Sequence, residues 1–144
     1  MTELKQRAAQ KILATALKTA REKELKPLAV AVYDARGALK AFAAEDGTSL
    51  KRGEVAMGKA YGALALGVPS RAIAKMAAER PHFVAAVTHA VGGSLVPVPG
   101  GVLIRDRKGE IAGAVGISGD TSDNDEMAAV AGIEAAGMAA ETGA

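Results

Sequence analysis

Two segments of this chain repeat one pattern, and that repeat restricts the folds open to it. Residues 28–42 form an apolar run, a turn and a second apolar run, and residues 101–117 repeat that order. The turns carry Asp34 with Gly37 and Asp106 with Gly109. An aspartate that opens a tight turn accepts amide hydrogens two residues on, and the glycine tolerates positive φ. We therefore predict two β-hairpins that pair within one antiparallel sheet.

Helical periodicity surrounds the hairpins and sets the fold class. The expected order is helix, hairpin, two helices, short strand, hairpin and helix, and it gives an α+β fold with five antiparallel strands, as in profilin-like and PAS-like sheets. The segment 82–91 is ambiguous between helix and loop. The expected helices span about 2–23, 50–66, 71–79 and 123–138, and the short strand spans about 94–96. The expected caps are Thr48 or Ser49 for the second helix, Ser70 for the third, and Ser122 with Asp125 for the last.

Length and composition narrow the class of protein. Residues 1–144 are enough for a single domain with its own core. The absence of cysteine and the charged start of the chain predict a cytoplasmic protein. No apolar run approaches the roughly 20 residues that cross a bilayer, which argues against a membrane protein. Interspersed charges, a net charge of +2 and only 3% aromatic residues argue against nucleic-acid binding.

The apolar content also suggests how the protein works. Hydrophobic residues make up 49% of a chain that is poor in bulky side chains, so a ligand site is expected in a surface cleft or at a subunit interface. A chain this short and this apolar is expected to self-associate into a particle heavier than 14.5 kDa.

Several pieces of the chain together carry a family resemblance: residues 28–37, 45–47, 59–61, 100–101 and 109–119, followed by Asp125 and the alanine-rich final helix. They resemble the GlcG/HbpS-like haem-binding proteins, which include the C-terminal domain of PduO-type proteins, and they run in family order over nearly the whole chain. The resemblance implies a profilin-like sheet with helices on both faces, dimers or larger rings, and haem or tetrapyrrole binding in some members.

Haem needs an axial ligand, and the chain offers His82 and His89. If residues 81–90 are helical, both lie near one face, where they suit haem or a metal. Alternatively, His82 follows Pro81 at a helix start and His89 is an ordinary polar residue, and two histidines without a third donor make an incomplete metal set. Further donors, Met57, Tyr61 and Met76, stand at helical spacing and are more typical of core.

Charged residues supply the other candidate ligand contacts. Glu45 and Asp46 follow the first hairpin. One hypothesis is that they bind a ligand or a neighbouring subunit, and the other is that they cap the next helix. On that helix, Lys59 and Arg52 could together pair with the propionates of haem or with the carboxylate of a small acid. Their position on a solvated helix face would explain both residues equally well.

The loop 116–119 before the last helix resembles an anion cradle. Its acidic neighbours would repel an anion, so helix capping explains them better. No catalytic triad, acid–base pair or cofactor fingerprint stands out. The first hypothesis is therefore that the protein binds haem or a related tetrapyrrole. The residues predicted to contact this ligand are Glu45, Asp46, Lys59, His82 and His89. An enzyme or enzyme accessory for a small hydroxy or keto acid is the alternative, and a purely structural assembly unit is the third reading.

Overall fold

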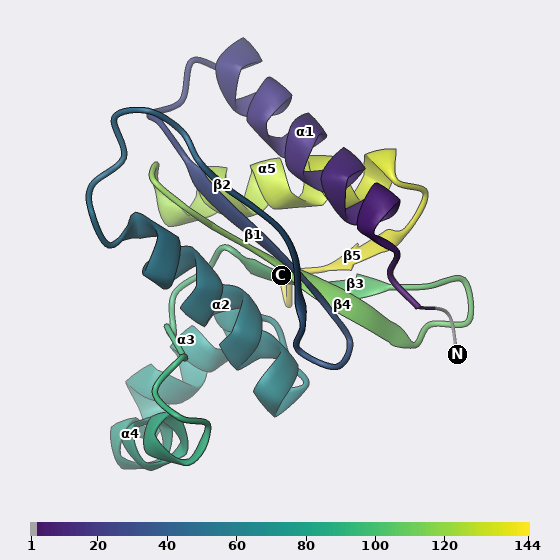
Figure 1. Cartoon of the computed structure of the whole chain (residues 1–144). Helices are drawn as coiled ribbons and strands as arrows, with labels where there is room; N and C mark the ends of the chain where they lie inside the picture. The colour runs from purple at the N-terminus through teal and green to yellow at the C-terminus, as the bar shows by residue number, and fades with distance from the viewer. Residues whose placement is uncertain (1–2) are drawn as a thin grey trace.

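The computed structural model describes residues 3–144, which form five helices and five strands around one sheet (Figure 1). The start of the first expected helix at Thr2 lies outside the described residues. The elements are α1 (Gln6–Glu22), β1 (Ala29–Asp34), β2 (Leu39–Ala44), α2 (Arg52–Leu66), α3 (Ser70–Glu79), α4 (Pro81–Ala90), β3 (Gly101–Arg105), β4 (Ile111–Ser118), α5 (Ser122–Ala135) and β5 (Ala139–Glu141).

The two predicted hairpins join within one antiparallel sheet of order β2-β1-β4-β3-β5. β1 pairs with β2, β3 pairs with β4, and the hairpins meet where β1 pairs with β4. In that central pair Ala29 lies opposite Ser118 and Asp34 lies opposite Gly113. The α+β prediction with five antiparallel strands is confirmed.

The hairpin turns use the same hydrogen bonds. Asp34 Oδ1 accepts the amide hydrogens two and four residues on, each at 3.0 Å, and Asp106 Oδ1 accepts the equivalent pair at 2.9 and 3.0 Å. Gly37 has a φ of 85° and Gly109 a φ of 80°. A side chain would disfavour this backbone conformation. The turn chemistry predicted from the Asp-x-x-Gly spacing is therefore confirmed.

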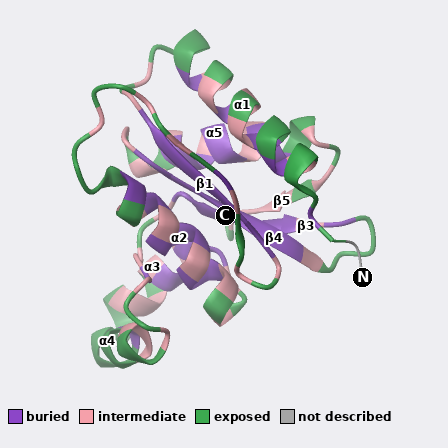
Figure 2. Ribbon diagram, viewed as in Figure 1, coloured by how far each residue is buried: buried purple, intermediate pink, exposed green. Residues whose placement is uncertain are grey.

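Helices cover both faces of the sheet (Figures 1 and 2). On one face α1 and α5 pack on Val30, Val32 and Val115, among others, and on the other face α2 packs on Ala29 and Ala31. β1 is buried along its whole length because both of its faces are covered. Among the described residues no helix is both long enough and apolar enough to cross a membrane.

Small residues bring α2 close to the sheet. A Cβ on Gly116 of β4 would lie only 1.9 Å from the carbonyl oxygen of Ala56, so only glycine fits there. The α2-facing core is rich in alanine, including Ala56, Ala60 and Ala63. This close packing places the Lys59 side chain against the end of β4.

Some sequence predictions were wrong. Residues 94–96 form no strand; Val96 instead donates its amide hydrogen to the carbonyl oxygen of Gly58 on α2, at 3.1 Å. The fifth strand is β5, which pairs with β3. The last helix was expected to reach Met138, but it ends at Ala135, shortly before Gly137 with a φ of 79°.

The predicted helix caps also differ. The residue before α2 is Lys51, without a side-chain cap, so neither Thr48 nor Ser49 fills that role. At α5, Thr121 rather than Ser122 accepts the capping hydrogen bond, from the amide of Asn124. Ser70 is the first residue of α3 and does not cap it.

Candidate functional site

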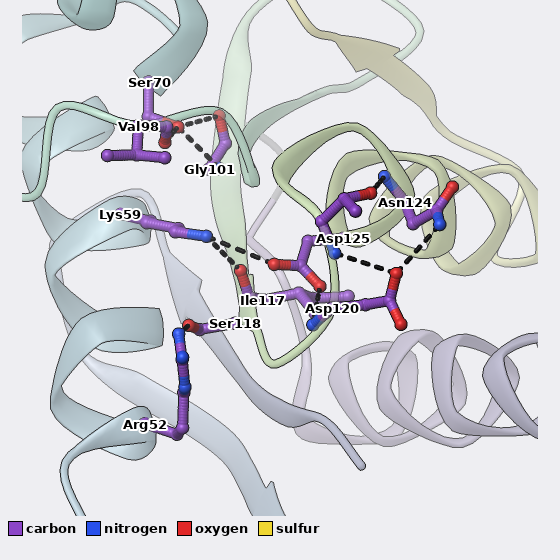
Figure 3. Close-up of polar contacts among 11 residues, drawn as sticks. Arg52, Lys59, Ser70, Val98, Gly101, Ile117, Ser118, Asp120, Asn124 and Asp125 are labelled. Carbon is purple, nitrogen blue, oxygen red and sulfur yellow. Dashed lines mark hydrogen bonds and ion pairs between the residues drawn. The ribbon is translucent and has the colours of Figure 1, made fainter. Parts of the chain in front are cut away.

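A buried ion pair joins α2 to the start of α5 (Figure 3). Lys59 Nζ lies 3.4 Å from Asp125 Oδ2 and donates a hydrogen bond of 2.8 Å to the carbonyl oxygen of Ile117. The side chains of Lys59 and Asp125 are only 3% and 2% exposed. The interpretation of Lys59 as part of a solvated helix face is therefore wrong.

Burial shapes the charges of this pair. It lowers the pKa of Lys59 and raises the pKa of Asp125, while each partner opposes the shift of the other. Asp125 Oδ1 also accepts the amide hydrogen of Asp120 at 2.9 Å, so both carboxylate oxygens are engaged. The pair fixes α2, β4 and α5 relative to one another and presents no free charge to solvent.

The paired glycines of the resemblance pack against Lys59. A Cβ on Gly100 would lie 2.9 Å from Lys59 Nζ, and one on Gly101 would lie 2.3 Å from the Lys59 carbonyl oxygen. Ser70 Oγ accepts the Gly101 amide hydrogen at 2.7 Å and donates to the Val98 carbonyl oxygen at 2.6 Å. Motifs that lie far apart in the sequence thus form one framework.

The acidic residues at the start of α5 are already partnered. Arg71 on α3 forms ion pairs with Asp123 and Glu126, and these bonds raise the pKa of Arg71. Asp120 accepts amide hydrogens of Lys26 and Thr121 together with the Asn124 side chain, which lowers the pKa of Asp120 to about 2. Within residues 3–144 no group of three or more His, Asp or Glu side chains is placed to hold a metal ion.

Glu45 and Asp46 take different positions at the end of β2. Glu45 Oε1 accepts the Leu28 amide hydrogen at 2.8 Å, and Oε2 lies 3.1 Å from Arg21 Nε. Glu45 therefore fastens α1 and β1 and does not cap α2. Asp46 is exposed and, with Arg21 and Pro27, lines an open cleft of about 470 Å³.

Arg52 lies at the mouth of a smaller polar cleft. Its Nη1 donates a 3.0 Å hydrogen bond to Ser118 Oγ, one residue beyond the carbonyl that Lys59 binds. Lys26, Thr48 and Ser49 line the same cleft, whose volume is about 230 Å³. Arg52 is open to an anion, whereas Lys59 is not, so the two cations do not form one open anion site.

The histidines lie elsewhere, on α4. The helical alternative for 82–91 is confirmed, and both His82 and His89 are exposed. Figure 2 shows most of α4 as exposed, and Val84 is its one buried residue. The core interpretation of Met57, Tyr61 and Met76 agrees with their packing against two buried clusters.

Sequence reasoning missed an apolar groove on the other face of the sheet. It lies between the start of α1 and the turn from α5 to β5 and has a volume of about 600 Å³. Leu4 and Ala8 belong to the helix predicted over residues 2–23, but the wall that includes Met138 depends on the unpredicted turn before β5. The five predicted site residues thus fall in three places: Glu45 with Asp46, Lys59 in the interior, and the two histidines on α4.

Comparison with known proteins covers nearly the whole chain. The family model described as "Haem degrading protein HbpS-like" matches residues 4–134. No curated protein matches the chain significantly.

Solved structures share the fold. The crystal structure of a PduOC–haem complex superposes with a TM-score of 0.85 at 22% identity, over 97% of this chain and 99% of that one. HbpS superposes with a TM-score of 0.79 at 27% identity, over 93% of this chain and 90% of that one. A double mutant of Streptomyces reticuli HbpS superposes with a TM-score of 0.78 at 26% identity, over 93% of this chain and 87% of that one.

Proposed function

The chain belongs to the HbpS-like family, and we propose that it binds haem or a related tetrapyrrole. The family is described as haem-degrading, and one structure with this fold was solved as a haem complex. These similarities support haem or a related tetrapyrrole as the ligand. We infer which residues of this chain bind it from the positions of its own side chains. Because the chain contains no cysteine, the proposal keeps the expected cytoplasmic location.

The outward face of α4 carries the proposal. His82 and His89 are seven positions apart, which places them on one face about 10.5 Å apart along the helix axis. Between them on that face lie Ala85 and Ala86, both exposed. The result is a short apolar strip with an imidazole at each end, and imidazole is the haem ligand of globins and peroxidases.

Neighbouring side chains fit the rest of a haem. Phe83 is 38% exposed and offers an aromatic face, and the Arg80 guanidinium lies 4.2 Å from its ring centroid. An arginine can form paired hydrogen bonds with a propionate carboxylate. Bound haem would supply a redox-active iron, and α4 would supply the axial ligand and one wall.

The other predicted ligand residues have separate roles in this proposal. Glu45 and Lys59 position the framework through the contacts described above. Asp46 keeps its carboxylate exposed beside the 470 Å³ cleft and is the member of this group open to a ligand or to a neighbouring subunit.

Haemin titration of the full chain tests the proposal. We expect a saturable Soret band that is lost or shifted in His82→Ala or His89→Ala and that stays unchanged in Lys75→Ala, an exposed position on the adjacent helix. Circular dichroism checks that each variant is folded. A Soret band unchanged in the double histidine variant, or a non-saturable spectrum for the parent protein, would contradict the proposal.

Self-association is part of the same proposal. Leu50 is 89% exposed, and Leu39 and Phe42, at 47% and 39%, lie on β2 at the open edge of the sheet. Exposed apolar side chains, two of them on an unpaired edge strand, are typical of an interface. We expect light scattering to give a mass well above 14.5 kDa, and Leu50→Glu with Phe42→Glu to reduce it. A monomeric parent protein would contradict this part.

A small hydroxy or keto acid is the second candidate ligand, for an enzyme or enzyme accessory. Its support is the cleft of about 230 Å³ that Arg52 and Lys26 line. Two such cations can hold a carboxylate. A thermal-shift panel of these acids tests it. Stabilisation that disappears in Arg52→Ala and persists in the double histidine variant would favour this candidate over haem.

A further inference from the structure

We propose that the groove between α1 and the α5–β5 turn binds a free fatty acid, at a site separate from the haem face on α4. The two places lie on opposite faces of the sheet: α1 and α5 cover one face, whereas α2, α3 and α4 lie on the other (Figure 1). The groove and the α4 strip share no residue.

The floor of the groove is apolar. Leu4 lies two residues before α1, and Ala8 lies in its first turn. Ala112 belongs to β4, and Ala136 and Met138 come from the turn before β5. Three alanines in this set leave room where larger side chains would fill the space. The groove volume is about 600 Å³. This volume lies within the range of sites that bind small molecules.

The rim is cationic on the α1 side. Lys5, Arg7 and Lys11 line the groove, and Glu3 is the one acidic side chain among its lining residues. An apolar floor under a cationic rim complements an alkyl chain that ends in a carboxylate. The chain would lie on the partly exposed Ala8, Ala136 and Met138, above the buried Leu4 and Ala112, and the carboxylate would pair with Lys11 or Arg7.

The groove suits a ligand that needs no axial donor. Its lining contains no histidine, and both histidines of the chain lie on α4. A haem there would lack the imidazole that α4 offers, whereas a fatty acid needs only apolar contact and a cation.

Calorimetric titration of the full chain with dodecanoate tests the proposal. We expect one dodecanoate per chain, and binding of dodecanol at least about tenfold weaker because it lacks the charge. Lys11→Glu should weaken dodecanoate binding by a similar factor. Lys18→Glu, an exposed α1 position outside the groove, should leave it unchanged.

A second pair of variants tests the floor. Ala135 lines the groove and is exposed, so Ala135→Trp should block the site without disturbing the core. Ala14→Trp, exposed on α1 outside the groove, is its control. Equal dodecanoate binding by Ala135→Trp and Ala14→Trp, or no binding by the parent protein, would overturn the proposal.

Two further results would assign the groove to another occupant and would also overturn it. If Ala135→Trp abolishes haemin binding, the groove is the tetrapyrrole site. If Ala135→Trp lowers the mass in light scattering, the groove is a contact between copies. The two proposals fail separately. The haem proposal fails if the double histidine variant keeps an unchanged Soret band, and in either case this variant is expected to bind dodecanoate as the parent protein does.

Discussion

Lys59 and Asp125 form an ion pair in the interior, with Nζ and Oδ2 3.4 Å apart, although 66 positions separate them in the chain. The lysine belongs to α2 and the aspartate to the first turn of α5. Because α2 and α5 lie on opposite faces of the sheet, the pair connects the two layers past the end of β4.

Removing one partner of this pair should destabilise the fold strongly. Lys59→Met leaves the buried Asp125 carboxylate without its cation, and the expected loss is about 3–5 kcal/mol in the free energy of unfolding. Urea denaturation measures it, with the exposed Lys75→Met as control. The double variant Lys59→Met with Asp125→Asn should recover part of the loss. A loss below about 1 kcal/mol in the single variant would show that the pair is not buried as described.

Ser70 should matter through its hydroxyl alone. Ser70→Ala leaves the buried amide hydrogen of Gly101 and the carbonyl oxygen of Val98 without this partner. The expected cost is about 1–3 kcal/mol in the free energy of unfolding. Ser49→Ala, at an exposed position, is the matched control and should cost nearly nothing. Equal stability of the two variants in urea would contradict the bridging role.

Gly116 should tolerate no side chain. A Cβ there would lie 1.9 Å from the Ala56 carbonyl oxygen. Gly116→Ala must therefore push α2 away from β4, at an expected cost of about 3 kcal/mol or more. A Cβ on Gly109 meets no atom within 4 Å. Gly109→Ala should lose only about 1–2 kcal/mol, because of its positive φ. Thermal unfolding of both variants makes the comparison, and the reverse ranking would refute it.

Asp120 should contribute to acid sensitivity. Hydrogen bonds from the Lys26 amide, the Asn124 side chain and the Thr121 amide lower its pKa from an ordinary 3.8 to about 2 in the folded state. Its contribution to stability is therefore complete above pH 3.8 and is lost as the pH falls toward 2. Asp120→Asn should be less stable than the parent protein at pH 5, and the difference should shrink by pH 2. Urea midpoints across this range measure it; a gap that widens on acidification would have the wrong sign.

The sequence allowed the sheet to be predicted because its signals are local. Asp34 with Gly37 and Asp106 with Gly109 each determine a turn within four residues. The segment 94–96 has strand-like residues, but its apolar side chains pack against α2 instead. β5 was missed because its alanines carry little strand preference, and the strand depends on pairing with β3.

The site was harder to predict because its contacts are long-range. Lys59 was recognised as a special residue, but nothing near it in the chain indicates Asp125 as its partner. Likewise, Glu45 was expected near a helix start, and its contacts with Arg21 and Leu28 appear only once α1 and β1 are in place. The placement of His82 and His89 on one helix face is the part of the proposed haem site that periodicity could anticipate.

The contact of Gly116 with Ala56 also limits how this protein can diversify. Where helix and strand backbones nearly touch, a mutation that enlarges one side chain needs a simultaneous loss of volume opposite. Single substitutions in this layer therefore destabilise the fold. New specificities are then expected in the surface clefts and on the outer faces of the helices, where substitutions do not disturb this layer. A change of ligand in this protein is thus expected to leave the backbone of the packed layer almost unaltered.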